Sequence, residues 1–190
     1  LTATIACDAL TPDHVIGVAM PSKYNPDSSL DDAKQLAKNL GIKIKEISIE
    51  DTVEDIRTLI SENIEQQLKS VVDENIQSRV RGNLLMALSN QLNAMVVSTG
   101  NKSEMAVGYA TLYGDLVGGF ALLKDVYKAD VYNLAKYRNS ISDVIPQNTI
   151  DKEPSAELSE NQFDSDSLPN YDILDKIIKL YIEEDYSSEK

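Results

Sequence analysis

Residues 98–120 combine the types of side chain that can hold a phosphate group. The segment contains several glycines, one lysine and two acids. It follows an apolar run over 94–99, which predicts a buried strand. A strand, a small-residue turn and a new helix leave free backbone N–H groups at the helix start, and such groups bind anions. The glycines could equally serve only as turn residues, and Glu104 could simply stabilise the helix dipole. The segment therefore predicts either a phosphate site or a plain turn.

Histidine and cysteine are too few for several common kinds of catalysis. His14 and Cys7 are single residues of their types, and no serine lies in a nucleophile-elbow pattern, so a catalytic triad is excluded. A metal site of the Cys/His type is excluded by the same count. Cys7 lies in an apolar run, which predicts a buried thiol in a reducing compartment. We therefore expect a chemistry that needs no nucleophile from the protein.

The elements that must position these residues alternate between helices and strands. We expect helices over 1–10, 29–40, 51–68, 74–92 and around 174–181, with strands over 15–20, 42–49 and 94–99. This alternation predicts an α/β fold, with one parallel sheet that has helices on both faces, in a single domain over 1–190. Ligands of such sheets bind beyond the carboxyl ends of the strands. The residues just after Met20, Thr99 and Leu123 are therefore the expected place for a site.

Charge and hydropathy exclude some partners. The net charge is −13 and no basic patch interrupts it, so we expect no nucleic-acid partner. Much of the acid lies in 151–189 and is expected to be solvated. The absence of a bilayer-length apolar stretch and of a signal pattern predicts no membrane partner and a cytoplasmic location. The long polar connection over 139–169 is expected to be a mobile loop.

Several motifs together resemble the NAD+ synthetase family. They occur in the family's order and cover nearly the whole chain, at Val15-Ile-Gly-Val-Ala-Met-Pro-Ser22, Glu74-Asn-Ile-Gln-Ser-Arg-Val-Arg-Gly-Asn83, Ser98-Thr-Gly-Asn-Lys-Ser-Glu104, Tyr109-Ala-Thr-Leu-Tyr-Gly-Asp115 and Lys152-Glu-Pro-Ser-Ala-Glu-Leu158. The resemblance implies a Rossmann-like adenine nucleotide alpha hydrolase fold of the ATP pyrophosphatase type, with ATP over the carboxyl edge of the sheet.

The resemblance also implies roles for six residues. These are ATP contacts at Thr99, Lys128 and Ser155, and dinucleotide contacts at Asn75, Arg79 and Glu104. Glu104 would in addition hold Mg2+, a hard cation that prefers carboxylate oxygen. The implied reaction is the amidation of deamido-NAD+ (nicotinic acid adenine dinucleotide) to NAD+ through an acyl-adenylate, with ATP converted to AMP and pyrophosphate.

The sequence differs from the family pattern in two ways, which concern the nitrogen donor and the segments expected at either end of the domain. Leu112 stands where ammonia-dependent relatives tend to have lysine, which resembles the glutamine-dependent branch, whose members carry an N-terminal glutaminase domain. Ammonia could thus enter directly or come from glutamine. The family's first strand and its Ser-Gly-Gly-x-Asp-Ser phosphate loop are expected just before Leu1, and a basic stretch just after Lys190. We therefore expect a truncated synthetase domain that is inactive alone, from a homodimeric or larger parent.

Two alternatives stay open. The first is another ATP pyrophosphatase amidotransferase, such as one that makes GMP, which shares the adenylation chemistry. The second is a non-catalytic fragment that serves in dimerisation or nucleotide binding.

Overall fold

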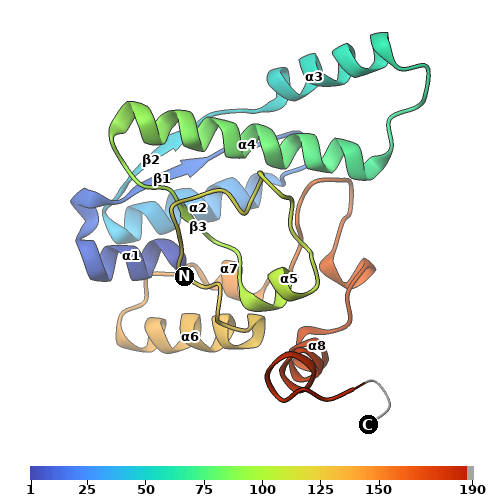
Figure 1. Cartoon of the computed structure of the whole chain (residues 1–190). Coiled ribbons are helices and arrows are strands. Elements are labelled where there is room, and N and C mark those ends of the chain that lie inside the picture. The colour runs from blue at the N-terminus through green and yellow to red at the C-terminus, as the bar shows by residue number, and fades with distance from the viewer. Residues whose placement is uncertain (188–190) are drawn as a thin grey trace.

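The computed structural model describes residues 1–187 of the chain (Figure 1). Its regular elements are α1 (Thr2–Leu10), β1 (Ile16–Ala19), α2 (Asp27–Leu40), β2 (Lys43–Glu46), α3 (Glu50–Asn63), α4 (Ser70–Leu92), β3 (Val97–Ser98), α5 (Lys102–Ala106), β4 (Phe120–Ala121), α6 (Lys128–Ile141), α7 (Gln147–Asp151) and α8 (Tyr171–Ile178). Short helical turns are η1 (Pro12–His14), η2 (Asp164–Asp166) and η3 (Lys179–Glu183). Within residues 1–187, no helix is long and apolar enough to cross a membrane.

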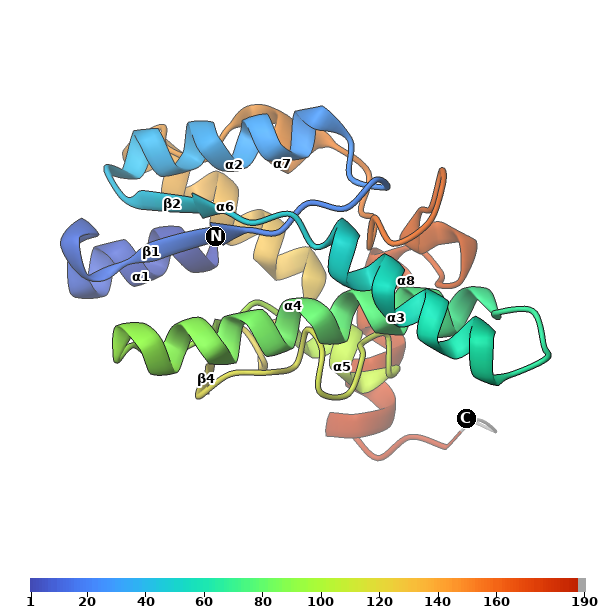
Figure 2. The same ribbon diagram turned by 90° about the horizontal axis from the view of Figure 1, so that it is seen from above.

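The strands form two parallel pairs, β1 with β2 and β3 with β4. Parallel pairing was predicted, and Figure 2 shows the β1–β2 pair between α2 and α4, so helices cover both faces as expected. Among the described residues the strands are hydrogen-bonded as two separate pairs, because β1 and β3 do not pair with each other. The second pair is short. Gly118, at φ +151°, turns the chain into β4, and Gly119 N–H donates to Val96 O at 2.9 Å.

The long helix predicted over 51–68 ends earlier, at Asn63. The next helix begins at Ser70 rather than Glu74. An ion pair accompanies the break: Arg57 of α3 donates to both carboxylate oxygens of Asp73 of α4, from Nε at 2.5 Å and from Nη2 at 3.0 Å. The chain must reverse between the two helices for these side chains to meet.

Two apolar clusters make up the core. In the first, Ile49 and Val53 are fully buried against Ile76 and Val80 of α4. The four-residue apolar spacing predicted on that helix is therefore confirmed near its start, but not at its end, where Leu92 is exposed. Cys7 is buried and free, as predicted.

The second cluster gathers Ala135, Ile145 and Ile150. It draws on the connection over 139–169, which also contains α7 and η2. The connection therefore has secondary structure of its own, although its mobility stays a prediction.

Close backbone contact joins α4 to the loop over 109–118. A Cβ added at Gly82 would meet Tyr113 O at 2.8 Å and Gly114 O at 3.0 Å. A Cβ at Gly114 would meet Ser78 Cβ at 2.8 Å. Real Cβ atoms do not approach backbone this closely, so glycine is required at both positions. The contact holds the loop against α4.

We predict that Gly82→Ala lowers the melting temperature by ~2–12 °C. Overpacking of this kind costs about 1–3 kcal/mol, and each kcal/mol corresponds to about 2–4 °C in a chain of this size. The melting temperature is measured by thermal unfolding followed by circular dichroism. Gly17→Ala is the matched control, since its added Cβ would meet Ile44 at an ordinary 3.6 Å. Equal melting temperatures of the two variants would contradict the packing argument.

Candidate functional site

A pocket of about 730 Å³ lies beyond the carboxyl ends of the strands, where the strand pattern predicted a site. Met20, Thr99 and Leu123, which follow β1, β3 and β4, all line it. We call it the central pocket. It brings together five of the six residues that the motifs singled out: Asn75, Thr99, Glu104, Lys128 and Ser155. Thr99 and Glu104 come from one motif, and the other three come from separate segments of the chain.

A lysine–carboxylate pair occupies one wall of the central pocket. Lys128 Nζ lies 2.7 Å from Glu104 Oε1, and each side chain is about one-fifth exposed. Glu104 also belongs to a capping box with Asn101, in which each side chain accepts a bond from the other residue's backbone N–H. The expectation of free amides at this helix start is therefore wrong for Asn101 and Glu104. The charged pair, rather than the helix end, is the polar feature of this wall.

Hydrogen bonds from buried side chains set the position of Lys128. Its backbone N–H donates to Ser103 Oγ at 2.8 Å, and the Ser103 hydroxyl in turn donates to Asp175 of α8. Asp175 also accepts the backbone N–H of Ala129 at 3.0 Å. Ser103 and Asp175 are both buried. Ser103 lies within the motif over 98–104 but was given no role there, and Asp175 lies outside every motif, so their contact was not predicted from the sequence.

The facing wall is formed by α4 and the loop over 109–118. Asn75 Oδ1 accepts a bond from the Thr111 hydroxyl at 2.8 Å. Thr111 N–H donates to Asp115 Oδ1 at 2.7 Å. Asn75 is thus held on its carbonyl side, and its amide nitrogen has no partner among the described side chains. That nitrogen is a donor on the lining of the pocket.

The two arginines of α4 differ in location. Arg79 is exposed, donates to Leu112 O at 3.2 Å and does not line the central pocket. Arg81 does line it, and donates to Met20 O at 3.0 Å and to Asn25 Oδ1 at 3.1 Å. Burial lowers the pKa of Arg81 from its ordinary value, and the nearby Glu157 charge opposes this. The substrate role predicted for Arg79 stays a prediction, and Arg81 is the arginine of α4 that lines the pocket.

The segment that carries Ser155 is tied down at Glu157. Glu157 has a left-handed backbone, at φ +53°, and accepts bonds from Ser29 at 2.6 Å, Asn25 at 2.8 Å and Lys152 at 3.0 Å. Ser155 Oγ accepts the Glu157 N–H at 3.0 Å and donates to Gln162 O. These contacts hold Ser155 on the lining of the central pocket.

We predict that Glu157 contributes stability that acid removes. Burial raises its pKa, but the bonds from Ser29, Asn25 and Lys152 outweigh burial and hold the pKa below its ordinary 4.5. A lowered pKa in the folded state gives stability that is present above pH ~4.5 and is lost as the pH falls through the folded pKa. The free energy of unfolding, measured with urea from about pH 6 to pH 3, should fall less steeply with decreasing pH in Glu157→Gln than in the wild type. Glu160→Gln changes an exposed carboxylate of the same segment, so its unfolding free energy should depend on pH as in the wild type. The same pH dependence in all three proteins would contradict the prediction.

A parallel α/β fold with a pocket at the carboxyl ends of its strands has the architecture in which open α/β proteins bind their ligands. The sequence profile described as NAD synthase matches residues 1–190. The chain belongs to the NAD synthase family, and its fold is that of the adenine nucleotide alpha hydrolases.

Similar proteins agree with this assignment. A glutamine-dependent NAD(+) synthetase of Thermotoga maritima is 48% identical over 100% of this chain and 33% of its own length. The structure of a glutamine-dependent NAD+ synthetase from Acinetobacter baumannii, in complex with ADP, has 44% identity and a TM-score of 0.77 over 98% of this chain and 33% of that one. The structure of an NMN synthetase from Francisella tularensis has 29% identity and a TM-score of 0.84, over 94% of this chain and 71% of that one. The chain thus spans about a third of the length of the glutamine-dependent relatives.

Proposed function

We propose that the protein containing this chain is a ligase that amidates deamido-NAD+ to NAD+ with ATP. The observation that carries the proposal is the convergence of Asn75, Thr99, Glu104, Lys128 and Ser155 on one pocket. The names of the similar proteins support the activity, and the ADP complex of one of them supports a nucleotide in this fold.

The reaction has two steps. A carboxylate oxygen of the nicotinate attacks the α-phosphorus of ATP, which forms the acyl-adenylate and releases pyrophosphate. Ammonia then attacks the acyl carbon, loses a proton, and AMP leaves. No protein nucleophile is required, so the chain's work is to position two anionic substrates and to offset their charge.

Residues of the central pocket divide this work. Lys128 would neutralise phosphate charge, and Thr99 and Ser155 would donate hydroxyl bonds to ATP. Asn75 would donate its free amide N–H to the dinucleotide, with Arg79 at the outer end of that site. Closure of the loop over 139–169 on ATP would keep water from the acyl-adenylate. The bonds of Glu157 would keep Ser155 on the pocket lining.

Glu104 is the carboxylate that would hold Mg2+ together with ATP phosphates. Mg2+ commonly binds through one or two carboxylates together with phosphate oxygens of the substrate. Glu104 contacts Lys128, so ion binding would exchange that contact for Mg2+. When bound, the ion offsets charge on the phosphates.

We further propose the partners of the whole protein. Names of relatives favour glutamine as the source of ammonia, supplied by an N-terminal glutaminase domain, with free ammonia as the second source. A homodimer or larger homo-oligomer, in the cytoplasm, completes the proposal.

The decisive assay follows NAD+ and AMP formation by the full-length protein with ATP, Mg2+, deamido-NAD+ and either glutamine or ammonium. We predict that Lys128→Met lowers kcat/KM by about 100-fold or more, the usual effect of removing a charge-stabilising group. Lys124→Met, at an exposed lysine four residues away, should stay within about twofold of the wild type.

Substrate competition separates the alternatives. Consumption of XMP in place of deamido-NAD+ would indicate a GMP-forming amidotransferase. A protein that forms dimers in gel filtration but binds no ATP in titration would be a non-catalytic assembly module.

A further inference from the structure

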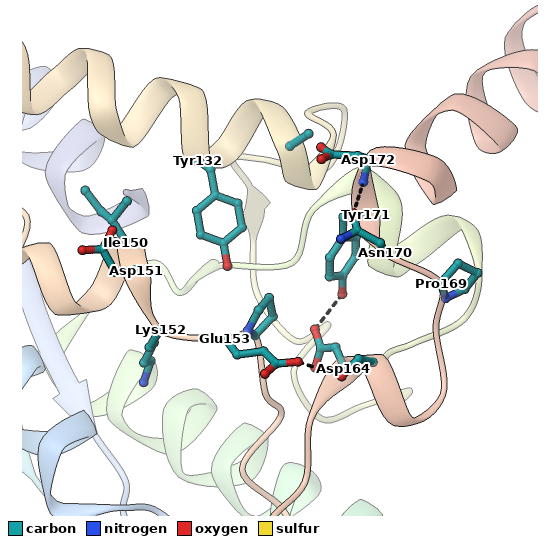
Figure 3. A pocket seen from close by; sticks show the side chains of 13 residues that line it. Tyr132, Ile150, Asp151, Lys152, Glu153, Asp164, Pro169, Asn170, Tyr171 and Asp172 are labelled. Atoms are coloured by element: carbon teal, nitrogen blue, oxygen red, sulfur yellow. Dashed lines mark hydrogen bonds between the residues drawn. The ribbon is translucent and has the colours of Figure 1, made fainter.

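The part of the chain that carries Ser155 is held in shape by its own hydrogen bonds. We call residues 152–162 the Ser155 segment, and Figure 3 shows its start, where the chain leaves α7 at Lys152. Gln162 closes the segment on itself, because its backbone carbonyl accepts the Ser155 hydroxyl and its Oε1 accepts the Leu158 N–H at 2.9 Å. These bonds set the shape of the segment, so its position on the central pocket depends on contacts with other parts of the chain.

Asn25, Ser29 and Gln77 are side chains outside the Ser155 segment that hold it in place. Asn25 lies between β1 and α2, and its Nδ2 donates to Glu157 Oε2 at 2.8 Å. The Ser29 hydroxyl donates to Glu157 Oε1 at 2.6 Å. Gln77 of α4 is fully buried and donates from Nε2 to Leu158 O at 2.9 Å. Glu157 therefore receives bonds from two of these three side chains.

The neighbours of Asn25 require a carboxamide at this position. Asn25 Oδ1 accepts the Ser22 backbone N–H at 2.8 Å and Arg81 Nη2 at 3.1 Å, while Nδ2 on the other side donates to the Glu157 carboxylate. A reversed amide would set its NH2 group against two donors and its oxygen against a carboxylate. An aspartate would set a second carboxylate oxygen against Glu157. Only a carboxamide offers an acceptor to one side and a donor to the other.

We propose that Asn25 is a positioning residue that holds the Ser155 segment on the central pocket and thereby sets the affinity for ATP. The inference rests on the proposed function, in which the Ser155 hydroxyl binds ATP. Asn25 acts through Glu157, because Nδ2 holds the Glu157 carboxylate and the Glu157 N–H donates to Ser155 Oγ at 3.0 Å. Since Oδ1 of the same amide holds Arg81, one side chain orients both a hydroxyl and a cation on the pocket lining.

The first test measures initial rates of the full-length protein with ammonium chloride as the nitrogen donor. Asn25→Asp keeps the acceptor for Arg81 and Ser22 but loses the donor to Glu157. The KM for ATP should rise by about tenfold or more, the usual effect of losing a hydrogen bond to a charged group. At saturating ATP, kcat should change by less than about threefold, because the groups that contact the substrates remain.

Asn161→Asp is the matched control for this test. It makes the same change of charge at an exposed asparagine of the Ser155 segment that does not line the central pocket. Its KM for ATP should equal that of the wild type. An unchanged KM for ATP in Asn25→Asp, an equal rise in both variants, or a loss confined to kcat would overturn the proposal.

An exchange of the two side chains tests whether Asn25 acts through Glu157. Combining Asn25→Asp with Glu157→Gln leaves the net charge unchanged and reverses the direction of the hydrogen bond, since the carboxamide now stands at position 157. Each single variant should raise the KM for ATP, and the double variant should return it to within about threefold of the wild type. If the effects of the two single variants simply multiply, the residues act independently and the proposal is wrong.

A second attachment covers the case in which Asn25→Asp does not fold. Ser29→Ala removes the other bond that reaches Glu157 from outside the segment, so the KM for ATP should rise a few-fold. Ser28→Ala, at the exposed neighbouring serine, should keep the wild-type KM. Equal KM values in these two variants would count against a positioning role for the contacts of Glu157.

Binding without turnover separates this inference from the proposed function. Calorimetric titration of the full-length protein with the α,β-methylene analogue of ATP, in which the bond to pyrophosphate cannot break, should give a Kd about tenfold higher in Asn25→Asp. The exchanged pair should restore the wild-type Kd. These results in a protein that forms no NAD+ would support the role of Asn25 and reject the function. Equal Kd values in a protein that does form NAD+ would reject the role of Asn25 alone.

Discussion

The buried carboxylate of Asp175 is the constraint on which the site depends. It accepts the Ser103 hydroxyl of α5 and the Ala129 N–H of α6 while it lies on α8 itself. Three helices from distant parts of the chain are thereby joined, and the first residue of α6, Lys128, is placed against Glu104. A buried charge is stable only when hydrogen bonds satisfy it, so the three helices cannot separate without leaving Asp175 unpaired.

The two walls of the central pocket are held by different physical means. The Lys128 wall relies on buried hydrogen bonds, whereas the Asn75 wall relies on close backbone contact, with Gly82 and Gly114 allowing a loop to lie directly on α4. The segment of Ser155 is held by a third means, the charged bonds at Glu157. The three parts of the pocket lining are therefore held by three separate kinds of contact.

The sequence by itself determined the α/β class, the parallel pairing, most helix positions and five of the residues that meet in the central pocket, because local periodicity and motif order carry that information. Only the tertiary structure decided which arginine faces the pocket, where α3 ends, and that the strands form two pairs. Arg79 and Arg81 share one helix and one motif, and packing alone makes one exposed and the other a lining residue. Ser103 and Asp175 gain their roles from a contact between segments distant in sequence, which no local pattern records.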